Sequence, residues 1–246
     1  YSTDVSDGLL AGSVPAGEHS VTTSGILTEI ARSNAIDLID AELLYARSVM
    51  VDKFPTGIVS YVADSFDHWT FVTHILPQLK NEVMSRDGKF VVRGDSGNPV
   101  HIIAGYEITV VDQEEMNDYN DDWDEYWNAL QAYLYDGSTE VYNFGGKFYK
   151  VDMDECTYEE IKSYEAHGTI ECLWDIFGGT VNDLGYRVLD SHIGMIYGDG
   201  ITPQRQKEIL QRLKAKKLAS LNVVFGVGSY TLNLVSRDHL GIAIKA

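Results

Sequence analysis

The chain has 246 residues, of which 44% are hydrophobic and 23% are charged, a balance typical of a globular protein large enough for one sizeable α/β domain. A net charge of −18 excludes a protein that coats nucleic acid, because neutralising phosphates requires clustered Lys and Arg. No apolar run reaches the roughly 20 residues of a membrane-spanning helix, no signal-peptide pattern opens the chain, and the only cysteines, Cys156 and Cys172, exclude a disulfide-built secreted scaffold. We therefore expect a cytoplasmic protein without membrane or nucleic-acid partners.

The first part of the chain predicts two helices, a strand and a third helix. Apolar residues recur at helical spacing over 21–33 and 36–52. Residues 57–63 form a short apolar run typical of a buried strand. A helix is expected over 67–85, kinked or divided at Pro77, because proline cannot continue a helix without losing a hydrogen bond.

Strands, polar loops and helices then alternate. Strands are expected at 89–92, 193–197 and 222–225, and a helix at 203–217. This alternation is the signature of parallel βα units, and in barrels built from such units the loops after the strand ends form the active site.

Residues 106–165 break this rhythm. They hold 17 acids and 3 bases, a net charge of −14, whereas the rest of the chain holds 20 acids and 16 bases, so the main body does not oppose an anionic substrate. Hairpin signals at Asp136-Gly137 and Gly145-Gly146, and a helix over 121–135, predict an acidic α+β subdomain. One side of that helix is apolar, with Trp123, Trp127, Leu130 and Leu134.

We expect this subdomain to be inserted between two parts of one catalytic core, 1–105 and 166–246. A solvated decoration with a small packed core or an oligomer contact explains it better than a second active site. The chain starts without Met and stops in an apolar run, 241–246, that resembles an unfinished strand. We therefore expect a fragment cut at both ends.

The first polar cluster surrounds His19. Residues 13–20 read Ser-Val-Pro-Ala-Gly-Glu-His-Ser, which places the histidine between Glu18 and Ser20. There it can titrate near neutrality, act as a nucleophile or be held by a carboxylate. The alternative is a hydrogen-bonded histidine at a helix start with Ser20 as the N-cap, and this octapeptide alone favours neither interpretation.

The second cluster follows the strand expected at 89–92. The Arg93 guanidinium is a rigid fork for phosphate or a planar amide, and Asp95 can hold a ribose hydroxyl or a metal-bound water. A simple Arg–Asp pair in a tight turn is the alternative. The position directly after an apolar strand disfavours it, since buried charges are costly.

Two glycine loops complete the pattern, Gly198-Asp199-Gly200 and residues 226–229 (Gly-Val-Gly-Ser). Glycines let backbone N–H groups approach phosphate oxygens, although such loops are also ordinary turns. Arg237 and Lys245 add positive charge, and each alone is better explained as a solvated side chain. Together the clusters predict a site for a sugar phosphate, and composition and spacing go no further.

Six motifs in order resemble the nicotinamide phosphoribosyltransferases of the nicotinate and nicotinamide phosphoribosyltransferase family, in its bacterial or phage form. They are Ser13-Val14-Pro15 with Glu18-His19-Ser20, Val62-Ala63-Asp64-Ser65-Phe66-Asp67, Arg93 with Asp95-Ser96-Gly97-Asn98-Pro99, Tyr197-Gly198-Asp199-Gly200, Phe225-Gly226-Val227-Gly228 and Ser236-Arg237-Asp238. The resemblance covers nearly the whole chain except the acidic insertion. Each motif alone is weak, so their order carries the resemblance.

The resemblance implies a type II phosphoribosyltransferase fold, an irregular α/β barrel, in a homodimer with shared active sites. It implies that nicotinamide reacts with 5-phosphoribosyl 1-pyrophosphate to give nicotinamide mononucleotide and pyrophosphate, in NAD biosynthesis. Mg²⁺ is the implied cofactor, and ATP is an activating co-substrate. Mg²⁺ and cationic side chains would stabilise the leaving pyrophosphate, and carboxylates the developing charge on the sugar.

The resemblance also implies roles for single residues. His19 resembles the catalytic histidine that ATP phosphorylates, Arg93 the residue that contacts both the pyridine amide and phosphate, and Asp64 an acidic residue near metal and ribose. On this pattern the catalytic residues are expected to be His19, Asp64, Arg93 and Asp95. Besides Arg93, the positions expected to contact substrate are Asp95, Gly198 and Asp199 at the ribose, Ser229, Arg237 and Lys245 at phosphate, and Ser13, Gly94 and Gly228 beside them. No metal ligand is assigned.

Two features depart from the family pattern. Ser229 stands where the family form has glycine, so the geometry of the phosphate loop is expected to differ. The acidic residue that selects the amide over the acid precedes the Ser-Val-Pro motif; Asp4 is one match, but residues 1–3 align better with a later tyrosine segment, which places the selector before Tyr1. Because this selector is not identified, a nicotinate phosphoribosyltransferase is one alternative. A non-catalytic binding module and an unrelated sugar-phosphate barrel enzyme are the other two.

Overall fold

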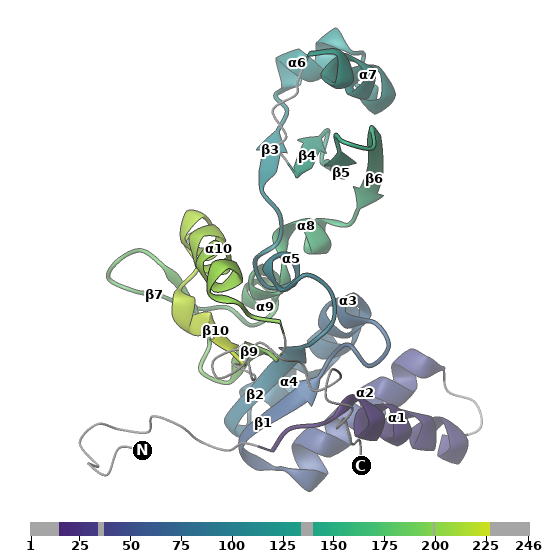
Figure 1. Ribbon diagram of the computed structural model, residues 1–246. Coiled ribbons are helices and arrows are strands. Elements are labelled where there is room, and N and C mark those ends of the chain that lie inside the picture. Colours follow the sequence, from purple (N-terminus) through teal and green to yellow (C-terminus); the bar gives the residue numbers. More distant parts are fainter. Residues whose placement is uncertain (1–14, 34–36, 134–139, 199, 227–246) are drawn as a thin grey trace, which may run out of the picture.

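The computed structural model describes residues 15–33, 37–133, 140–198 and 200–226. Within these ranges the chain forms a core built on a parallel sheet and an elongated projection that holds a second sheet (Figure 1). No helix in the described ranges is long and apolar enough to cross a membrane.

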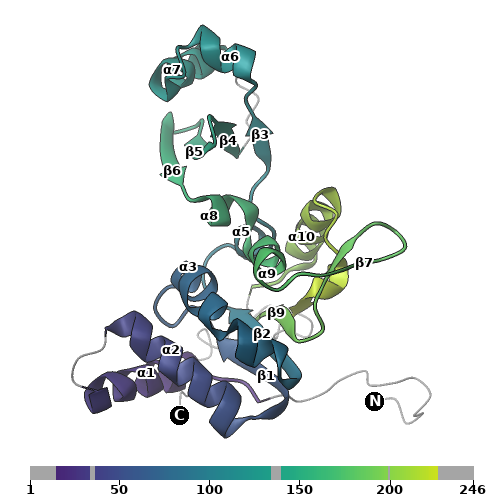
Figure 2. The same cartoon turned by 180° about the vertical axis from the view of Figure 1, so that it is seen from behind.

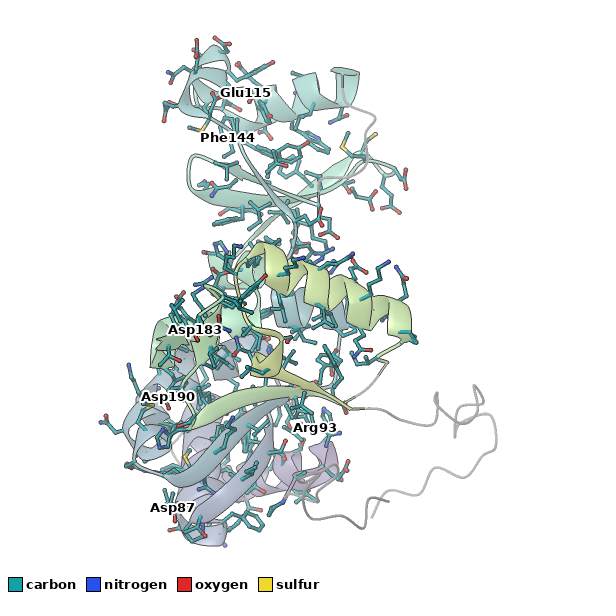
Figure 3. All side chains as sticks on the ribbon, turned by 90° about the vertical axis from the view of Figure 1, so that its left-hand side faces the viewer. Asp87, Arg93, Glu115, Phe144, Asp183 and Asp190 are labelled. Carbon is teal, nitrogen blue, oxygen red and sulfur yellow. The ribbon has the colours of Figure 1, made fainter. Side chains whose placement is uncertain are left out.

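The core sheet contains parallel strands in the order β1 (Thr56–Val62), β2 (Asp87–Gly94), β9 (Ile193–Tyr197) and β10 (Val223–Phe225). The inner strands are apolar runs because helices cover the sheet, and residues such as Phe90 and Met195 are almost fully buried. Since all four strands run in one direction, their carboxyl ends meet at one edge. In Figure 3, Asp87 and Arg93 mark the two ends of β2. The predicted parallel βα units are confirmed.

Helices at the start of the chain pack beside β1. They are α1 (His19–Ser33), α2 (Leu38–Ser48) and the π turn η2 (Val49–Lys53), seen from behind in Figure 2. Their apolar faces join one core with the sheet, in which Ile26, Ala41 and Tyr45 are buried.

The connection from β1 to β2 is a divided helix, as the position of Pro77 predicts. Its parts are α3 (His68–Thr70), the π turn η3 (Phe71–Ile75), the 3₁₀ turn η4 (Leu76–Leu79) and α4 (Lys80–Met84). Pro77 lies at the first positions of the 3₁₀ turn, where its missing N–H removes no helical hydrogen bond.

The remaining connections follow the βα pattern with one interruption. After β2 come α5 (Pro99–Ala104), the projection, α8 (Ser163–His167), α9 (Thr169–Phe177) and the hairpin of β7 (Gly179–Val181) and β8 (Arg187–Leu189); after β9 come α10 (Pro203–Ala215) and the 3₁₀ turn η5 (Ser220–Asn222). Thr202 caps α10 by accepting a hydrogen bond from Arg205 N at 3.2 Å.

The projection has its own sheet and its own aromatic core. Its elements are β3 (Ile108–Val110), α6 (Gln113–Asp118), α7 (Trp123–Tyr133), β4 (Val141–Phe144), β5 (Lys147–Asp152) and β6 (Thr157–Ile161). Trp123 stacks on Tyr149 with ring centroids 4.0 Å apart. Trp127 and Leu130 are buried beside it, which confirms the predicted apolar side of this helix, while Leu134 and the expected Asp136-Gly137 turn lie outside the described residues.

The Gly145-Gly146 hairpin is confirmed. It joins the antiparallel strands β4 and β5 with φ values of 59° and 82°, a region that favours glycine.

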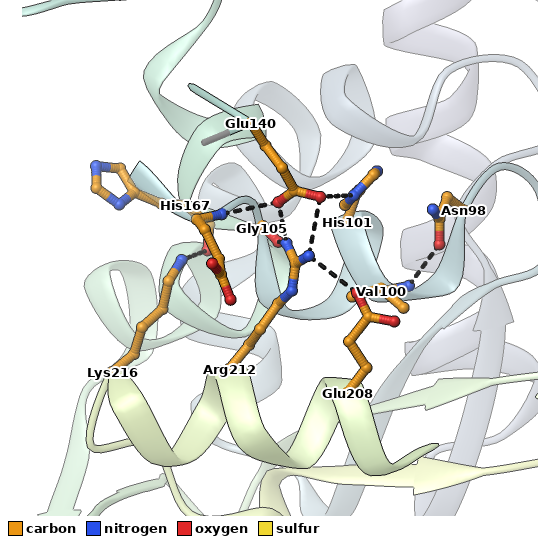
Figure 4. A network of polar contacts seen from close by, with 10 residues as sticks. Asn98, Val100, His101, Gly105, Glu140, His167, Glu208, Arg212 and Lys216 are labelled. Carbon is orange, nitrogen blue, oxygen red and sulfur yellow. Dashed lines mark hydrogen bonds and ion pairs between the residues drawn. The ribbon is translucent and has the colours of Figure 1, made fainter. Parts of the chain in front are cut away.

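The projection leaves and re-enters the core through two glycines in close contact. A Cβ on Gly105 would lie 2.3 Å from Ala166 O, and one on Gly168 would lie 2.3 Å from Gly105 N. Arg212 of α10 fixes this neck: it donates to Gly105 O at 2.8 Å and to both carboxylate oxygens of Glu140 at 2.6 and 2.9 Å (Figure 4). The insertion is therefore tied to the core by a buried cation.

Candidate active site

Backbone pairing of residues 15–17 with β1 places His19 near the carboxyl ends of the strands. Ser60 N donates to Pro15 O at 2.9 Å, and Gly17 N donates to Ser60 O at 3.2 Å, so residues 15–17 run beside β1. Helix α1 then begins at His19 itself. The predicted alternative of a hydrogen-bonded histidine at a helix start is therefore present, since His19 starts the helix and lies 3.0 Å from Asp64. Its expected cap is wrong, because Ser20 lies inside the first turn.

Asp64, two residues after β1, holds the imidazole of His19. Its Oδ1 lies 3.0 Å from His19 Nε2, while its Oδ2 accepts hydrogen bonds from Asp95 N at 3.0 Å and Ser96 N at 2.7 Å. Burial alone would raise the pKa of Asp64, but the hydrogen bonds from Ser96 and Asp95 and the nearby His19 lower it below its usual value. The carboxylate therefore stays charged and orients the ring, whose Nδ1 lies 3.9 Å from Asp95 Oδ2.

Arg93, at the end of β2, forms an ion pair that leaves polar atoms unused. Its Nη2 lies 3.2 Å from Asp95 Oδ2, and its Nη1 donates to Gly17 O at 3.3 Å. Arg93 Nε and Asp95 Oδ1 are buried without a hydrogen-bond partner. Because buried polar groups are nearly always paired, these two atoms mark a place where a bound molecule or water would add hydrogen bonds. The simple Arg–Asp pair of the alternative interpretation is thus present, but it does not satisfy all the hydrogen-bonding atoms of its two side chains.

Gly198 closes over this pair. An added Cβ would lie 2.6 Å from Asp95 Oδ1 and 3.0 Å from Arg93 Nε, and Gly198 N donates to Gly94 O at 3.2 Å. Gly226 makes a similar approach, since its Cβ would lie 2.9 Å from Gly198 Cα. These glycines are needed for close packing of backbone at the edge of the sheet.

Several motif residues have structural roles that their sequence did not reveal. Asp67 caps α3 by accepting from Thr70 N at 2.6 Å, and Asn98 caps α5 by accepting from Val100 N at 3.0 Å. His68 lies beneath the site, where burial lowers its pKa to about 4 and its Nε2 bonds Thr169 Oγ1 at 2.8 Å. The ring packs close to Gly94, where an added Cβ would lie 3.6 Å from His68 Cε1, so a neutral His68 lies against the backbone between Arg93 and Asp95.

Two contributors were missed by the sequence interpretation. The Gly17 carbonyl accepts a hydrogen bond from Arg93 Nη1. The Tyr197 hydroxyl donates to Ser96 O at 2.7 Å and Gly97 O at 3.2 Å. A tyrosine that ends an apolar strand directly before a glycine loop was the available signal for Tyr197.

The structure brings six of the predicted site residues together at one edge: His19, Asp64, Arg93, Gly94, Asp95 and Gly198. The other predicted residues, Ser13, Asp199, Gly228, Ser229, Arg237 and Lys245, lie outside the described residues. Within the described ranges no group of three or more His, Cys, Asp or Glu side chains is placed to hold a metal ion.

The arrangement combines a carboxylate-held histidine, an arginine and a second carboxylate in one place. A histidine oriented in this way can accept a phosphoryl group or a proton, and arginine is suited to phosphate. A model of the nicotinate phosphoribosyltransferase family matches residues 3–246. The chain belongs to this family.

Curated relatives agree with this family and are longer. The chain is 33% identical to the nicotinamide phosphoribosyltransferase of Acinetobacter baylyi over 97% of its length, and 31% identical to that of Mycoplasma pneumoniae, also over 97%. It is 27% identical over 95% to the enzyme of the same name from Xanthomonas campestris pv. campestris. The chain covers 36%, 39% and 34% of these proteins, respectively. The family resemblance expected from the motifs is confirmed.

Proposed function

We propose that the protein joins nicotinamide to 5-phosphoribosyl 1-pyrophosphate. The bond between the anomeric carbon and the pyrophosphate oxygen breaks, a bond from that carbon to the ring nitrogen of nicotinamide forms, and pyrophosphate leaves with the electron pair. The observation that carries the proposal is the convergence of His19, Asp64, Arg93 and Asp95 at one edge of a parallel sheet, in a chain of this family. The names of the relatives supply the choice of nicotinamide.

His19 is proposed to accept the γ-phosphoryl group of ATP on Nδ1: the N–P bond forms as the bond from phosphorus to the bridging oxygen breaks, and ADP leaves with the electron pair. Asp64 Oδ1 faces Nε2 at 3.0 Å and favours the tautomer with its proton there, which leaves the lone pair of Nδ1 available for attack. The His19 side chain is about one third exposed, so a phosphate donor has access to it. The new phosphate would add negative charge that orders the cations of the pyrophosphate site.

Arg93 is proposed to stabilise negative charge during the reaction, and Asp95 is proposed to stabilise positive charge. The Arg93 guanidinium would contact the substrate phosphate and the amide of the base, because its planar fork suits both. The Asp95 carboxylate would hold the ribose and stabilise positive charge on the sugar. For Mg²⁺, the Asp95 carboxylate supplies hard oxygen atoms, which suit a cation that usually takes one or two carboxylates together with substrate phosphates. Bound there, Mg²⁺ would neutralise the leaving pyrophosphate.

We further propose that the parallel sheet is part of an irregular barrel of type II phosphoribosyltransferases. The parallel strands in the order β1-β2-β9-β10, with helices between them, and the site at the strand ends support this. A homodimer with shared sites and a place in the cytoplasm complete the proposal.

The test is a choice of base by the full-length protein. It would be incubated with 5-phosphoribosyl 1-pyrophosphate, Mg²⁺ and either nicotinamide or nicotinate, with Arg93→Ala as the site variant and the exposed Arg32→Ala as its matched control. Mononucleotide from nicotinamide, lost in Arg93→Ala and kept in Arg32→Ala, is the expected result. Product from nicotinate alone would contradict nicotinamide as the substrate base. No product from either base would favour the binding-module alternative.

A further inference from the structure

We propose that Tyr197 is a positioning residue, which holds the loop of Asp95 and Ser96 at the place from which Asp64 orients His19. This inference rests on the proposed function. Tyr197 itself is 1% exposed and lies in the core, so it acts through other residues and does not touch substrate.

The hydroxyl and the ring of Tyr197 hold the loop from two sides. The hydroxyl donates to Ser96 O at 2.7 Å and to Gly97 O at 3.2 Å. The ring packs against Gly94, where an added Cβ would lie only 3.2 Å from it. Tyr197 is thus fitted to the backbone on which Arg93 and Asp95 stand.

Ser96 is held at both of its backbone groups. Its carbonyl accepts from Tyr197 at 2.7 Å, and its N–H donates to Asp64 Oδ2 at 2.7 Å. A continuous chain of hydrogen bonds therefore runs from β9 through the loop to Asp64, and from Asp64 to His19 at 3.0 Å. A shift of the loop would move the carboxylate that fixes the imidazole.

The loop depends on such anchors because it is exposed. Ser96, Gly97 and Asn98 are exposed to solvent, whereas Tyr197 is buried in the sheet. Exposed loops with few buried contacts open locally at low cost in free energy. A hydroxyl supplied from the rigid sheet therefore restricts the positions of the loop, as catalytic groups require.

The test compares Tyr197→Phe with Tyr45→Phe in the full-length protein. The first keeps the ring and removes the two hydrogen bonds, and the second removes a hydroxyl from a buried tyrosine of α2, away from the loop. Both would be assayed for mononucleotide formation and for amide hydrogen exchange of residues 94–98. We expect Tyr197→Phe to lower kcat about tenfold, with KM for nicotinamide within about twofold, and to speed exchange of the Asp95 and Ser96 amides. Tyr45→Phe should change neither.

Three outcomes would overturn the proposal. They are unchanged kcat, unchanged exchange at 94–98, and a variant that fails to fold or exchanges faster throughout, which would assign Tyr197 to the core alone. A wild-type protein without transferase activity would count against the proposed function instead. Exchange of the Asp95 and Ser96 amides would then still decide whether Tyr197 holds the loop.

Discussion

His19 Nε2 and Asp64 Oδ1 lie 3.0 Å apart although 45 residues separate them in the chain. The second oxygen of the same carboxylate is bound by the backbone of Asp95 and Ser96. One side chain thus joins the start of α1, the end of β1 and the loop after β2, and its loss should affect chemistry more than folding.

Replacing Asp64 with Asn should lower kcat by about 10²-fold or more, because an amide favours the wrong tautomer of the imidazole. The exposed Asp52→Asn is the control. Steady-state mononucleotide formation is the measurement, and equal rates for the two variants would contradict the role given to Asp64.

The same carboxylate predicts a dependence of stability on acid. Since the folded pKa of Asp64 is depressed below its ordinary value of 3.8, its stabilisation is present above about pH 4 and is lost as the pH falls through the folded pKa. Chemical denaturation between pH 2 and pH 5 should show a smaller loss of unfolding free energy in Asp64→Asn than in the wild type.

Gly198→Ala should abolish most of the activity while leaving the fold intact. Its methyl group would meet Asp95 Oδ1 at 2.6 Å and Arg93 Nε at 3.0 Å and would force the pair apart. Gly194→Ala, in β9 four residues before Gly198, places its methyl 3.4 Å from the flexible Lys89 side chain and should be tolerated. We expect kcat/KM to fall at least about 100-fold in the first and less than about threefold in the second.

Glu140→Ala should destabilise the junction between the projection and the core by about 2 kcal/mol, because it leaves Arg212 buried without its main counter-charge. Glu159→Ala removes an exposed partner of Lys150 at 4.0 Å and should cost less than about 0.5 kcal/mol. Urea denaturation monitored by tryptophan fluorescence measures both. Equal effects would show that the network in Figure 4 does not hold the projection.

The buried carboxyl group of Glu42 should make the protein less stable as the pH rises. Burial raises its pKa from 4.5 to about 7, so its protonated form is favoured in the folded state. A raised folded pKa leaves stability fully present below about pH 4.5 and removes it as the pH rises through about 7, by up to about 3 kcal/mol. Glu42→Gln should flatten the unfolding free energy between pH 5 and pH 8, and the exposed Glu114→Gln should leave that slope unchanged.

The sequence predicted the strands of the core and the polar clusters at their ends, because short apolar runs followed by glycine and charged residues recur along the chain in the order of parallel βα units. The order of β9 beside β2 follows from the parallel pattern only after the insertion between them is recognised. The charge distribution indicated that insertion, because residues 106–165 hold 17 acids and 3 bases whereas the rest of the chain holds 20 acids and 16 bases.

What the sequence could not predict is long-range pairing of single groups. Nothing in the sequence near Arg212 indicates that it will bind Glu140 and the Gly105 carbonyl, more than 70 residues away. The hydroxyl of Tyr197 is similar, since its partner loop precedes it by about 100 residues. Helix starts were also hard to predict: the helix expected over 21–33 begins two residues earlier, at His19, close to residues 15–17 that pair with β1.

The central claim is that His19, held by Asp64, belongs to a phosphoribosyl transfer site. The most direct test measures mononucleotide formation from nicotinamide and 5-phosphoribosyl 1-pyrophosphate in the presence of ATP and Mg²⁺, with the full-length protein, His19→Ala and His167→Ala. His167 is a matched control, because it is also a partly exposed histidine beside a carboxylate, at 3.4 Å from Glu171. We predict a fall of at least about 100-fold for His19→Ala and wild-type rates for His167→Ala. Equal rates in the two variants, or no product from the wild type, would contradict the account.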